Sequence, residues 1–222
     1  VPAEAGGYPI TDVGGQAFHG CVGMTHVTIP TNVVSIGIGA FAGCAGLADI
    51  AIPDSVTNIG SYAFADCASL RNVTLGPSVT SIGTGAFSGC RGLTGVAIPA
   101  SVDSIGDQAF DSCSGVAAIT GLSGVTRIGS GVFSGCSGLS GLAIPDGVTN
   151  IGWWAFSDCA GLTEISISAN VALIGDYAFS GCSSITGFSV DGANANYSSL
   201  EGALLNKTQT VLIKCPGGVT GK

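Results

Sequence analysis

The chain of 222 residues is acidic, with 6 Lys and Arg residues against 14 Asp and Glu residues and a formal net charge of −8. Because nucleic-acid binding needs a clustered cationic surface, and the basic residues here are few and dispersed, this composition excludes nucleic acid as a partner. No apolar run approaches the ~18 residues that a membrane-spanning helix requires, so we also expect no membrane insertion.

A strict 23-residue repeat dominates the sequence. Phenylalanine recurs at that interval from Phe18 onward, and a cysteine follows each one three positions later, beginning with Cys21. Such a period is the signature of a solenoid, whose coils bury their apolar faces against their neighbours. We therefore expect matching side chains to form two buried columns, made of Phe41, Phe64, Phe87, Phe110, Phe133, Phe156 and Phe179, and of Cys44, Cys67, Cys90, Cys113, Cys136, Cys159 and Cys182.

The placement of the cysteines favours free, buried thiols over disulfides. Eight of the nine occupy one repeat position, where a small apolar side chain packs well. A disulfide needs Cα atoms closer than about 7 Å with converging Cβ vectors, which stacked parallel positions rarely offer. With two histidines and no Cys-x-x-Cys pair, we expect no metal site and no cofactor.

Each coil contains two short extended segments and a turn, as residues 70–92 illustrate. Residues 73–75 alternate between apolar and polar side chains, which is typical of a strand with one buried face. Residues 78–83 alternate again and predict a second strand. Residues 85–90 place Ala, Phe and Cys at a helix-like spacing, which predicts a helical or 3-10 turn on the outer side. Because each strand position occurs once per coil, strands can pair only in parallel with neighbouring coils.

The series Leu-x-x-Ile-x-Ile, Pro-x-x-Val-x-x-Ile-Gly and Ala-Phe-x-x-Cys resembles the 23-residue unit of the BspA-like leucine-rich repeat proteins. The resemblance covers roughly residues 13–190 in eight copies. It implies a secreted or surface-exposed protein of the kind associated with adhesion, and the family has no catalytic residue to carry over. The fifth copy departs most, because Gly121-Leu122 replaces the usual Ile-Pro, so we expect its strand edge to be loosened.

These observations predict an α/β repeat solenoid over residues 1–190. It would be a right-handed stack of about eight coils of the leucine-rich-repeat type, with a parallel β-ladder and short helical or 3-10 turns on the outer side. Residues 191–222 resemble the hairpin that often closes such arrays, and residues 203–205 and 210–213 flank a polar turn, as in a hairpin. We interpret Cys215 as a packing substitute for an aromatic residue, and expect the chain to continue into a longer protein.

Two sets of exposed side chains are candidates for an interaction surface. The outward strand positions carry small polar residues, among them His26, Asp49, Asn72, Thr74, Thr120, Glu164 and Ser166. This face is poor in the Trp, Tyr and Arg residues that dominate binding hot spots. A solvated surface without a partner is therefore as good an interpretation as a binding surface. The second set is Trp153, Trp154 and Tyr177. Either one tryptophan caps the phenylalanine column and the other covers a coil junction, or an exposed tryptophan beside Tyr177 forms an adhesive patch.

Arrangements that would indicate catalysis or metal binding are weak. His19 and His26 flank Cys21, but we assign Cys21 to the buried column, and no residue orients it as a nucleophile. The spacing of Asp103, Asp107 and Asp111 fits a solvated acidic edge better than a calcium site.

We therefore predict that the chain is not an enzyme but a protein-interaction or adhesion module of a secreted or cell-surface protein. Its partner would be a protein or glycan on another cell or in extracellular matrix. The alternative is a structural repeat protein that self-associates into a filament or surface layer.

Overall fold

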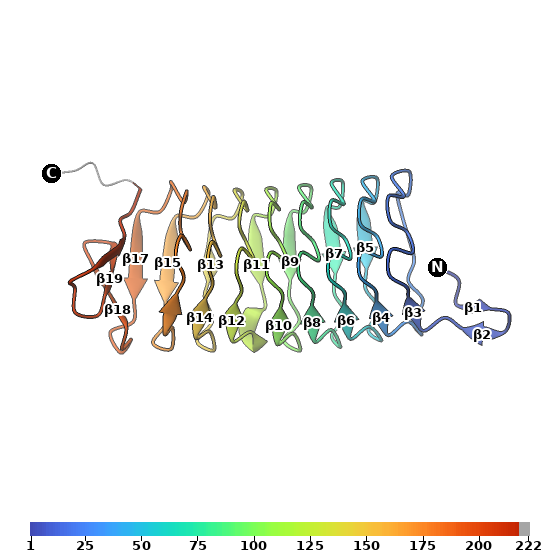
Figure 1. The fold of residues 1–222 in the computed structure, drawn as a ribbon, viewed down its shortest axis with the longest axis horizontal. Helices are drawn as coiled ribbons and strands as arrows, with labels where there is room; N and C mark the ends of the chain where they lie inside the picture. Colours follow the sequence, from blue (N-terminus) through green and yellow to red (C-terminus); the bar gives the residue numbers. More distant parts are fainter. Residues whose placement is uncertain (218–222) are drawn as a thin grey trace.

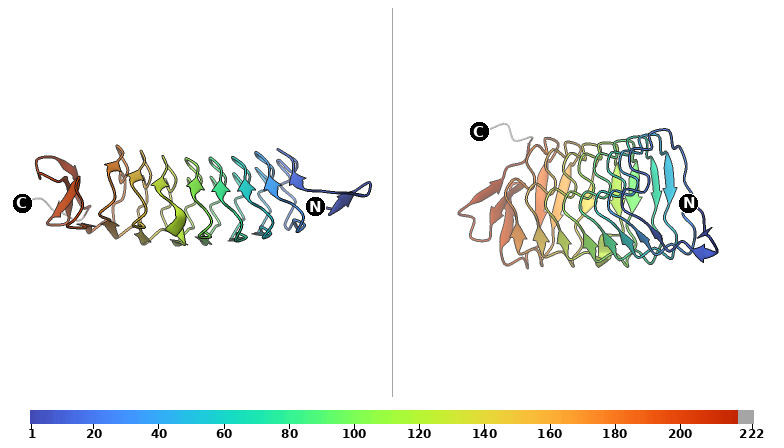
Figure 2. Two further views of the ribbon diagram at one scale, coloured as in Figure 1. Left: turned by 90° about the horizontal axis from the view of Figure 1, so that it is seen from below. Right: turned by 45° about the vertical axis from the view of Figure 1, so that its right-hand side comes forward.

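The structure is a computed structural model that describes residues 1–217. Its coils stack along one axis, as Figure 1 shows. At the N-terminal end, the hairpin of β1 (Glu4–Ala5) and β2 (Tyr8–Pro9) projects away from the first coil along that axis (Figures 1 and 2). At the other end lies an antiparallel sheet of β18 (Tyr197–Leu200), β19 (Ala203–Asn206) and β20 (Leu212–Lys214).

Two sets of parallel strands run along the stack, with one strand of each kind per coil except in the first coil, where residues 24–30 form no strand. Ladder A consists of β5 (Asp49–Ala51), β7 (Asn72–Thr74), β9 (Gly95–Ala97), β11 (Ala118–Thr120), β13 (Leu142–Ala143), β15 (Glu164–Ile167) and β17 (Gly187–Val190). Ladder B consists of β3 (Asp12–Val13), β4 (Ser35–Ile36), β6 (Asn58–Ile59), β8 (Ser81–Ile82), β10 (Ser104–Ile105), β12 (Arg127–Ile128), β14 (Asn150–Ile151) and β16 (Leu173–Ile174).

The register of both ladders follows the sequence repeat. Asp49 is opposite Asn72 in ladder A, and Ile36 is opposite Ile59 in ladder B, so that each residue faces its equivalent in the next copy. Within a strand, exposure alternates as the two-residue period predicts: Asn72 and Thr74 are exposed, whereas Val73 is buried. The prediction of a solenoid of stacked parallel coils is therefore confirmed.

The α/β class, in contrast, is wrong, because within residues 1–217 the single helical element is the 3-10 helix η1 (Leu122–Gly124). The segments with helix-like spacing are turns that contain two left-handed residues each, such as Gly85 (φ 60°) and Gly89 (φ 73°). A right-handed helix cannot include such residues at every fourth position, because its backbone needs φ near −63°.

Hydrogen bonds explain why these turns repeat so regularly. Phe87 N–H donates to the Ala109 carbonyl of the next coil over 2.8 Å, whereas Ser88 N–H donates within its own turn to the Gly85 carbonyl over 3.0 Å. Along each turn, backbone N–H groups thus alternate between donating to the next coil and donating within their own turn. The turns thereby form a third parallel array along the stack, which we call the turn array.

The phenylalanine column fills the interior beneath the turn array. From Phe18 to Phe179, the ring centroids of successive residues lie between 5.0 Å and 5.9 Å apart. The six rings from Phe41 to Phe156 are fully buried, and burying each one stabilises the fold by about 1.5–3 kcal/mol. Phe188 closes the column at its C-terminal end, edge-on to Phe179 at 5.2 Å.

The cysteine column lies beside the phenylalanines, and its thiols are free and buried from Cys44 to Cys182. Two cysteines differ from our expectation, because both Cys21 and Cys215 are exposed. In the described chain, no coil covers the outer side of the coil that contains Cys21. Cys215 follows the edge strand β20, so the interpretation of its side chain as a packing substitute is wrong.

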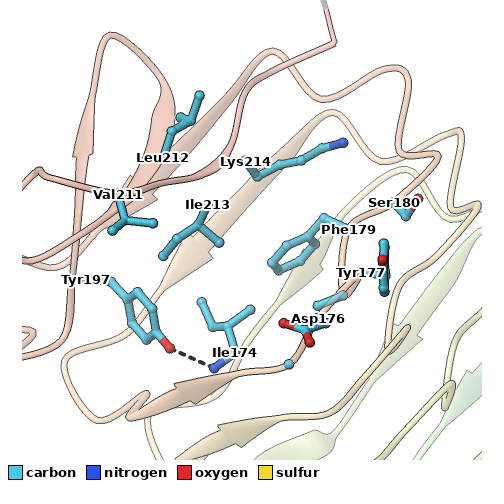
Figure 3. Close-up of a pocket in the computed structure, with 12 residues that line it drawn as sticks. Ile174, Asp176, Tyr177, Phe179, Ser180, Tyr197, Val211, Leu212, Ile213 and Lys214 are labelled. Carbon is cyan, nitrogen blue, oxygen red and sulfur yellow. Dashed lines mark hydrogen bonds between the residues drawn. The ribbon is translucent and has the colours of Figure 1, made fainter.

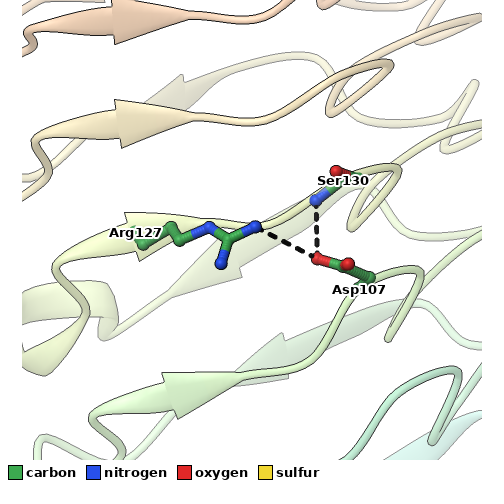
Figure 4. Close-up of polar contacts among 3 residues, drawn as sticks. All are labelled: Asp107, Arg127 and Ser130. Atoms are coloured by element: carbon green, nitrogen blue, oxygen red, sulfur yellow. Dashed lines mark hydrogen bonds and ion pairs between the residues drawn. The ribbon is translucent and has the colours of Figure 1, made fainter.

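Both ladders are interrupted in the fifth repeat, where the sequence predicts a loosened edge. Strands β11 and β13 of ladder A are not paired with each other, and neither are β10 and β12 of ladder B. Gly121 adopts φ 81°, and a Cβ atom there would lie 1.9 Å from the Ile98 carbonyl oxygen. This backbone lets Leu122 remain buried although proline is absent. At the gap in ladder B, the Asp107 carboxylate accepts a hydrogen bond from Ser130 N–H over 2.8 Å and pairs with Arg127 at 3.7 Å (Figure 4).

A fully buried amide ties the start of the C-terminal sheet to the coils, in addition to bonds such as that from Phe188 N–H to the Gly202 carbonyl. Asn194, with no exposed surface, donates to the carbonyl oxygens of Ser168 and Val171 over 2.7 Å and 3.0 Å. Its Oδ1 atom accepts hydrogen bonds from the backbone N–H groups of Asn196 and Tyr197. All four hydrogen bonds of this amide are thus made, which fixes the direction in which the chain enters β18.

Candidate interaction surfaces

The outward positions of ladder A form a flat face of small side chains. Every residue assigned to this face is exposed, namely His26, Asp49, Asn72, Thr74, Thr120, Glu164 and Ser166. Asn72 donates to the Asp49 carboxylate over 2.5 Å, and the His26 ring nitrogen Nδ1 lies 2.7 Å from the Thr25 hydroxyl. Part of the polar capacity of this face is therefore satisfied within the protein itself. Because ladder A is interrupted after β11, Thr120 and Glu164 belong to separate sheets.

The face has one shallow hollow near its C-terminal end. It has a volume of about 330 Å³ and is lined by Glu164 and Ser166 of β15 and by Gly187 and Ser189 of β17, among others. The hollow arises because Gly187, directly opposite Glu164 in the register, has no side chain. A polar group of a partner could hydrogen-bond there, but the residues supply no large apolar anchor.

Trp153, Trp154 and Tyr177, which we call the aromatic group, differ sharply from that face. Their exposed fractions are 58%, 49% and 65%. The Trp154 and Tyr177 rings are stacked at 6.0 Å with an interplanar angle of 5°, and Trp153 lies edge-on to Trp154 at 6.4 Å. Neither tryptophan caps the phenylalanine column, which Phe188 closes instead. The expectation that a tryptophan caps the phenylalanine column is therefore wrong, although Trp153 does lie against Gly175 of the next coil.

The backbone of the turn array explains why these rings point outward. Trp154 (φ 54°) and Tyr177 (φ 60°) occupy the left-handed position that glycine holds in other copies, such as Gly85 and Gly131. A left-handed residue other than glycine costs roughly 1–2 kcal/mol. Stacking between the two rings offsets about 0.5–1.5 kcal/mol of that cost. The same left-handed backbone occurs in every copy, for example at Tyr62 and Gln108, so it belongs to the repeat.

A larger groove lies between the last coil and the C-terminal sheet (Figure 3). Its volume is about 570 Å³, and its lining includes Tyr177 and Phe179 on one side and Val211, Leu212 and Ile213 on the other. These three aliphatic side chains are 54%, 58% and 38% exposed. The Tyr197 hydroxyl accepts a hydrogen bond from Ile174 N–H over 2.8 Å at the floor, and burial raises the pKa of this tyrosine.

Sequence reasoning missed this groove. We interpreted the pattern of residues 203–205 and 210–213 as a hairpin and did not predict a groove between it and the last coil. A signal was present in the three consecutive apolar residues Val211-Leu212-Ile213, since an alternating strand with one buried face would not place three together.

The residues considered for catalysis and metal binding are not organised into a site. Cys21 is exposed rather than buried. Asp107 and Asp111 line one hollow of the turn array, whereas Asp103 does not take part in it. Within residues 1–217, no group of three His, Cys, Asp or Glu side chains is arranged to hold a metal ion. The described residues also include no helix with the length and apolarity needed to cross a membrane.

Stacked coils with a 23-residue register, a buried phenylalanine column and parallel ladders define a leucine-rich-repeat solenoid. The chain belongs to the BspA-type leucine-rich repeat family, whose sequence profile, described as the BspA type leucine rich repeat region, matches residues 8–117 and 109–220. The resemblance noted from the sequence is thereby confirmed.

Solved structures of bacterial leucine-rich repeat proteins share the fold. A protein from T. pallidum is 35% identical, with 73% of this chain and 76% of that chain aligned and a TM-score of 0.69. A protein from Bacteroides ovatus is 27% identical over 82% of this chain and 59% of that chain, with a TM-score of 0.58. A protein from Eubacterium ventriosum is 29% identical over 70% of this chain and 41% of that chain, with a TM-score of 0.62. Comparison with curated proteins gave no match.

Proposed function

We propose that the chain is a non-catalytic interaction module of a secreted or cell-surface protein and that its role is adhesion. The partner would be a protein or a glycan on another cell or in extracellular matrix. Membership of a leucine-rich repeat family supports an interaction role, and the exposed aromatic group is the single observation that carries the proposal.

The aromatic group has the properties of a binding hot spot. Tryptophan and tyrosine are enriched among the residues that contribute most to binding, and three of them adjoin here. The stack of Trp154 on Tyr177 holds both rings in place before a partner arrives, which lowers the entropy lost on binding. The flat face of ladder A would add contact area around such an anchor rather than replace it.

A direct test measures adsorption of the purified chain to cultured epithelial cells and to surfaces coated with fibronectin, laminin or collagen. We expect saturable binding to at least one of these surfaces. Combined replacement of Trp153, Trp154 and Tyr177 by alanine should weaken it about tenfold or more, the loss expected from removing a hot spot. Absence of binding to all of these surfaces, or full binding by the triple variant, would contradict the proposal.

Self-association is a second candidate function, favoured by the C-terminal groove. Strand β20 is an edge strand of its sheet, and Leu212 and Ile213 of the strand, with the preceding Val211, are exposed. An exposed apolar edge strand is a template for pairing with a second chain. Light scattering over a range of protein concentrations tests this candidate: assemblies that dissociate in a Leu212→Glu variant would support it, and monomers at high concentration would exclude it.

A further inference from the structure

A hollow in the turn array lies immediately beside the aromatic group. Its volume is about 380 Å³, and it is lined by Asp107, Gln108, Asp111, Ser130, Gly131, Ser134 and Trp154. Gln108, Gly131 and Trp154 occupy the same position in three successive copies. The hollow exists because the middle residue of the three is glycine.

The spacing of the coils indicates what could enter between Gln108 and Trp154. In the phenylalanine column the two coil-to-coil steps at this level are 5.9 Å and 5.6 Å, and Gln108 and Trp154 are separated by both steps. A ring held between two side chains needs roughly 7–8 Å, since atoms in contact lie about 3.5–4.0 Å apart. The Gln108 side chain reaches over Gly131, where an added Cβ atom would lie 3.2 Å from Gln108 Cγ, so a larger residue at position 131 would crowd the space between Gln108 and Trp154.

One wall of the hollow is an aromatic platform of fixed orientation. Tyr177 covers the face of Trp154 that points toward the C-terminal coil, at 6.0 Å and an interplanar angle of 5°. The side of Trp154 toward Gly131 lines the hollow. A face of C–H groups, such as a pyranose ring presents, packs favourably on an indole because both surfaces are apolar.

The remaining lining is polar and held in place by the protein. Asp107 accepts a hydrogen bond from Ser130 N–H over 2.8 Å, as Figure 4 shows, and Asp111 accepts one from the Ser112 hydroxyl over 3.0 Å. With Gln108 and the serine hydroxyls, these carboxylates provide acceptors and donors around the aromatic wall. Such a rim suits the hydroxyl groups at the edge of a sugar ring.

The charges around the hollow favour a neutral ligand. Two carboxylates oppose binding of an anion. An aromatic face with two carboxylates could attract a Lys or Arg side chain of a partner protein. However, the Arg127 guanidinium lies 3.7 Å from Asp107, so an incoming cation would meet a like charge at the rim. A neutral ring with hydroxyl groups meets no such repulsion.

An earlier part of the same chain provides an internal comparison. Gln16, Gly39 and Tyr62 repeat the pattern of amide, glycine and aromatic residue four copies before Gln108, Gly131 and Trp154. There both carboxylates and both serine hydroxyls are missing, because the positions equivalent to Asp107, Asp111, Ser130 and Ser134 hold Gly15, His19, Ile38 and Ala42, and His19 alone of these has a polar side chain. The repeat alone therefore does not explain the polar lining of the second hollow.

We infer that the hollow between Gln108 and Trp154 binds one ring of a neutral saccharide. The ring stacks on Trp154 and its hydroxyl groups bond to Asp111, Gln108 and the neighbouring serines. This inference deepens the proposed function and rests on it, since it makes a surface glycan the ligand of the interaction module.

The test titrates the full chain with neutral oligosaccharides of glucose, galactose, mannose, xylose and N-acetylglucosamine to about 10 mM. Tryptophan fluorescence and calorimetry report binding. We expect at least one oligosaccharide to bind and to change tryptophan emission. Trp154→Ala should weaken that binding about tenfold or more. Tyr62→Ala, which removes an aromatic residue from the same repeat position at similar exposure, should leave it unchanged.

A second variant keeps the test decisive if Trp154→Ala fails to fold. Gly131→Asn fills the hollow, and asparagine tolerates the positive φ of 61° at this position. It should abolish saccharide binding while circular dichroism and the unfolding midpoint stay close to those of the unmodified protein. Binding that survives in Gly131→Asn would overturn the inference.

Two further outcomes would also overturn it. One is that no oligosaccharide of the panel binds. The other is that the chain binds a Lys- and Arg-rich peptide, and no saccharide, and that this peptide binding depends on Trp154. Periodate oxidation of the epithelial cells separates this inference from the proposed function. Adhesion that needs the aromatic group but persists after oxidation would support a module that binds protein and refute the sugar site. Saccharide binding without adhesion to any cell or matrix protein would leave the sugar site standing and refute the adhesive role.

Discussion

The Sγ atom of Cys113 donates a hydrogen bond to the carbonyl oxygen of Phe87 in the preceding coil, across 3.1 Å. The same bond recurs along the stack, for example from Cys90 to Phe64 and from Cys136 to Phe110. The two columns are therefore coupled, because each thiol ties its coil to the backbone of the coil before it. Cysteine suits the position because it is a small apolar side chain with a weak donor.

Alkaline pH should destabilise the fold through these thiols. Burial raises the pKa of Cys113 to about 12 and the pKa values of Cys44 and Cys182 to about 11. The unfolded chain would lose these protons near pH 9, where the folded chain still holds them, so the unfolded state gains stability as the pH rises. Stability is thus full below about pH 8.5 and falls as the pH rises toward the folded-state values, by up to about 1.4 kcal/mol per pH unit for Cys113.

Urea unfolding at a series of pH values between about 8 and 11 measures this slope. A Cys113→Ala variant should show a shallower decline than the unmodified chain, since it removes one of the titrating groups. A free energy of unfolding that stays constant over this range would contradict the role given to the buried thiols.

Thiol reactivity should divide the cysteines into two classes. Cys21 and Cys215 are exposed, whereas the other seven cysteines are buried. Because only an accessible thiolate attacks a disulfide reagent, two thiols per chain should react quickly with dithionitrobenzoate in native protein and the rest only after unfolding. Rapid reaction of more than two thiols in the native state would show that the column is open to solvent.

A break in the phenylalanine column should be costly in mid-stack. Phe110 is fully buried and stacks on Phe87 at 5.4 Å and on Phe133 at 5.9 Å. Phe110→Ala should lower the free energy of unfolding by about 3–5 kcal/mol, the range for large-to-small changes in a core. The surface variant Trp153→Ala serves as the control and should change stability much less. Equal effects of the two variants on urea unfolding would argue against a continuous packed column.

The C-terminal sheet should depend on Asn194. Replacing it by alanine leaves two carbonyl oxygens and two N–H groups without their partner, which should cost at least about 2 kcal/mol. Hydrogen exchange would show faster opening of β18 and β19 than of ladder A. Asn170→Ala, which removes one exposed hydrogen bond to the Asp146 carbonyl, is the matched control and should have little effect. Unchanged exchange in Asn194→Ala would refute this anchoring role.

The stacking of coils was predictable because a repeat without insertions forces equivalent residues into columns, as Phe64 and Phe87 illustrate. The turn array was not predicted, because the helix-like spacing of Ala86, Phe87 and Cys90 was given more weight than the two glycines in the same segment. Gly85 and Gly89 carried the signal, since they occupy the two left-handed positions of their copy. Two glycines four residues apart indicate turns rather than a helix.

The aromatic group was identifiable from the sequence, and an exposed tryptophan beside Tyr177 was one of the two alternatives that the sequence left open. The sequence did not show which tryptophan that is, whereas in the structure Trp154 stacks on Tyr177 and Trp153 lies edge-on to Trp154. The hollow beside it depends on three copies at once, with Gly131 between Gln108 and Trp154. A coil considered alone contains none of this geometry. Surfaces of a solenoid are made between copies, so the repeat predicts the scaffold better than it predicts the site.

The most direct test of the account compares adhesion of Trp154→Ala and Tyr62→Ala with that of the unmodified chain on epithelial cells. Both variants remove an exposed aromatic residue from the same left-handed position of the repeat, so their effects on the backbone are matched. The account predicts that Trp154→Ala loses most binding and that Tyr62→Ala retains it. Equal binding by the two variants would contradict an interaction surface centred on Trp154.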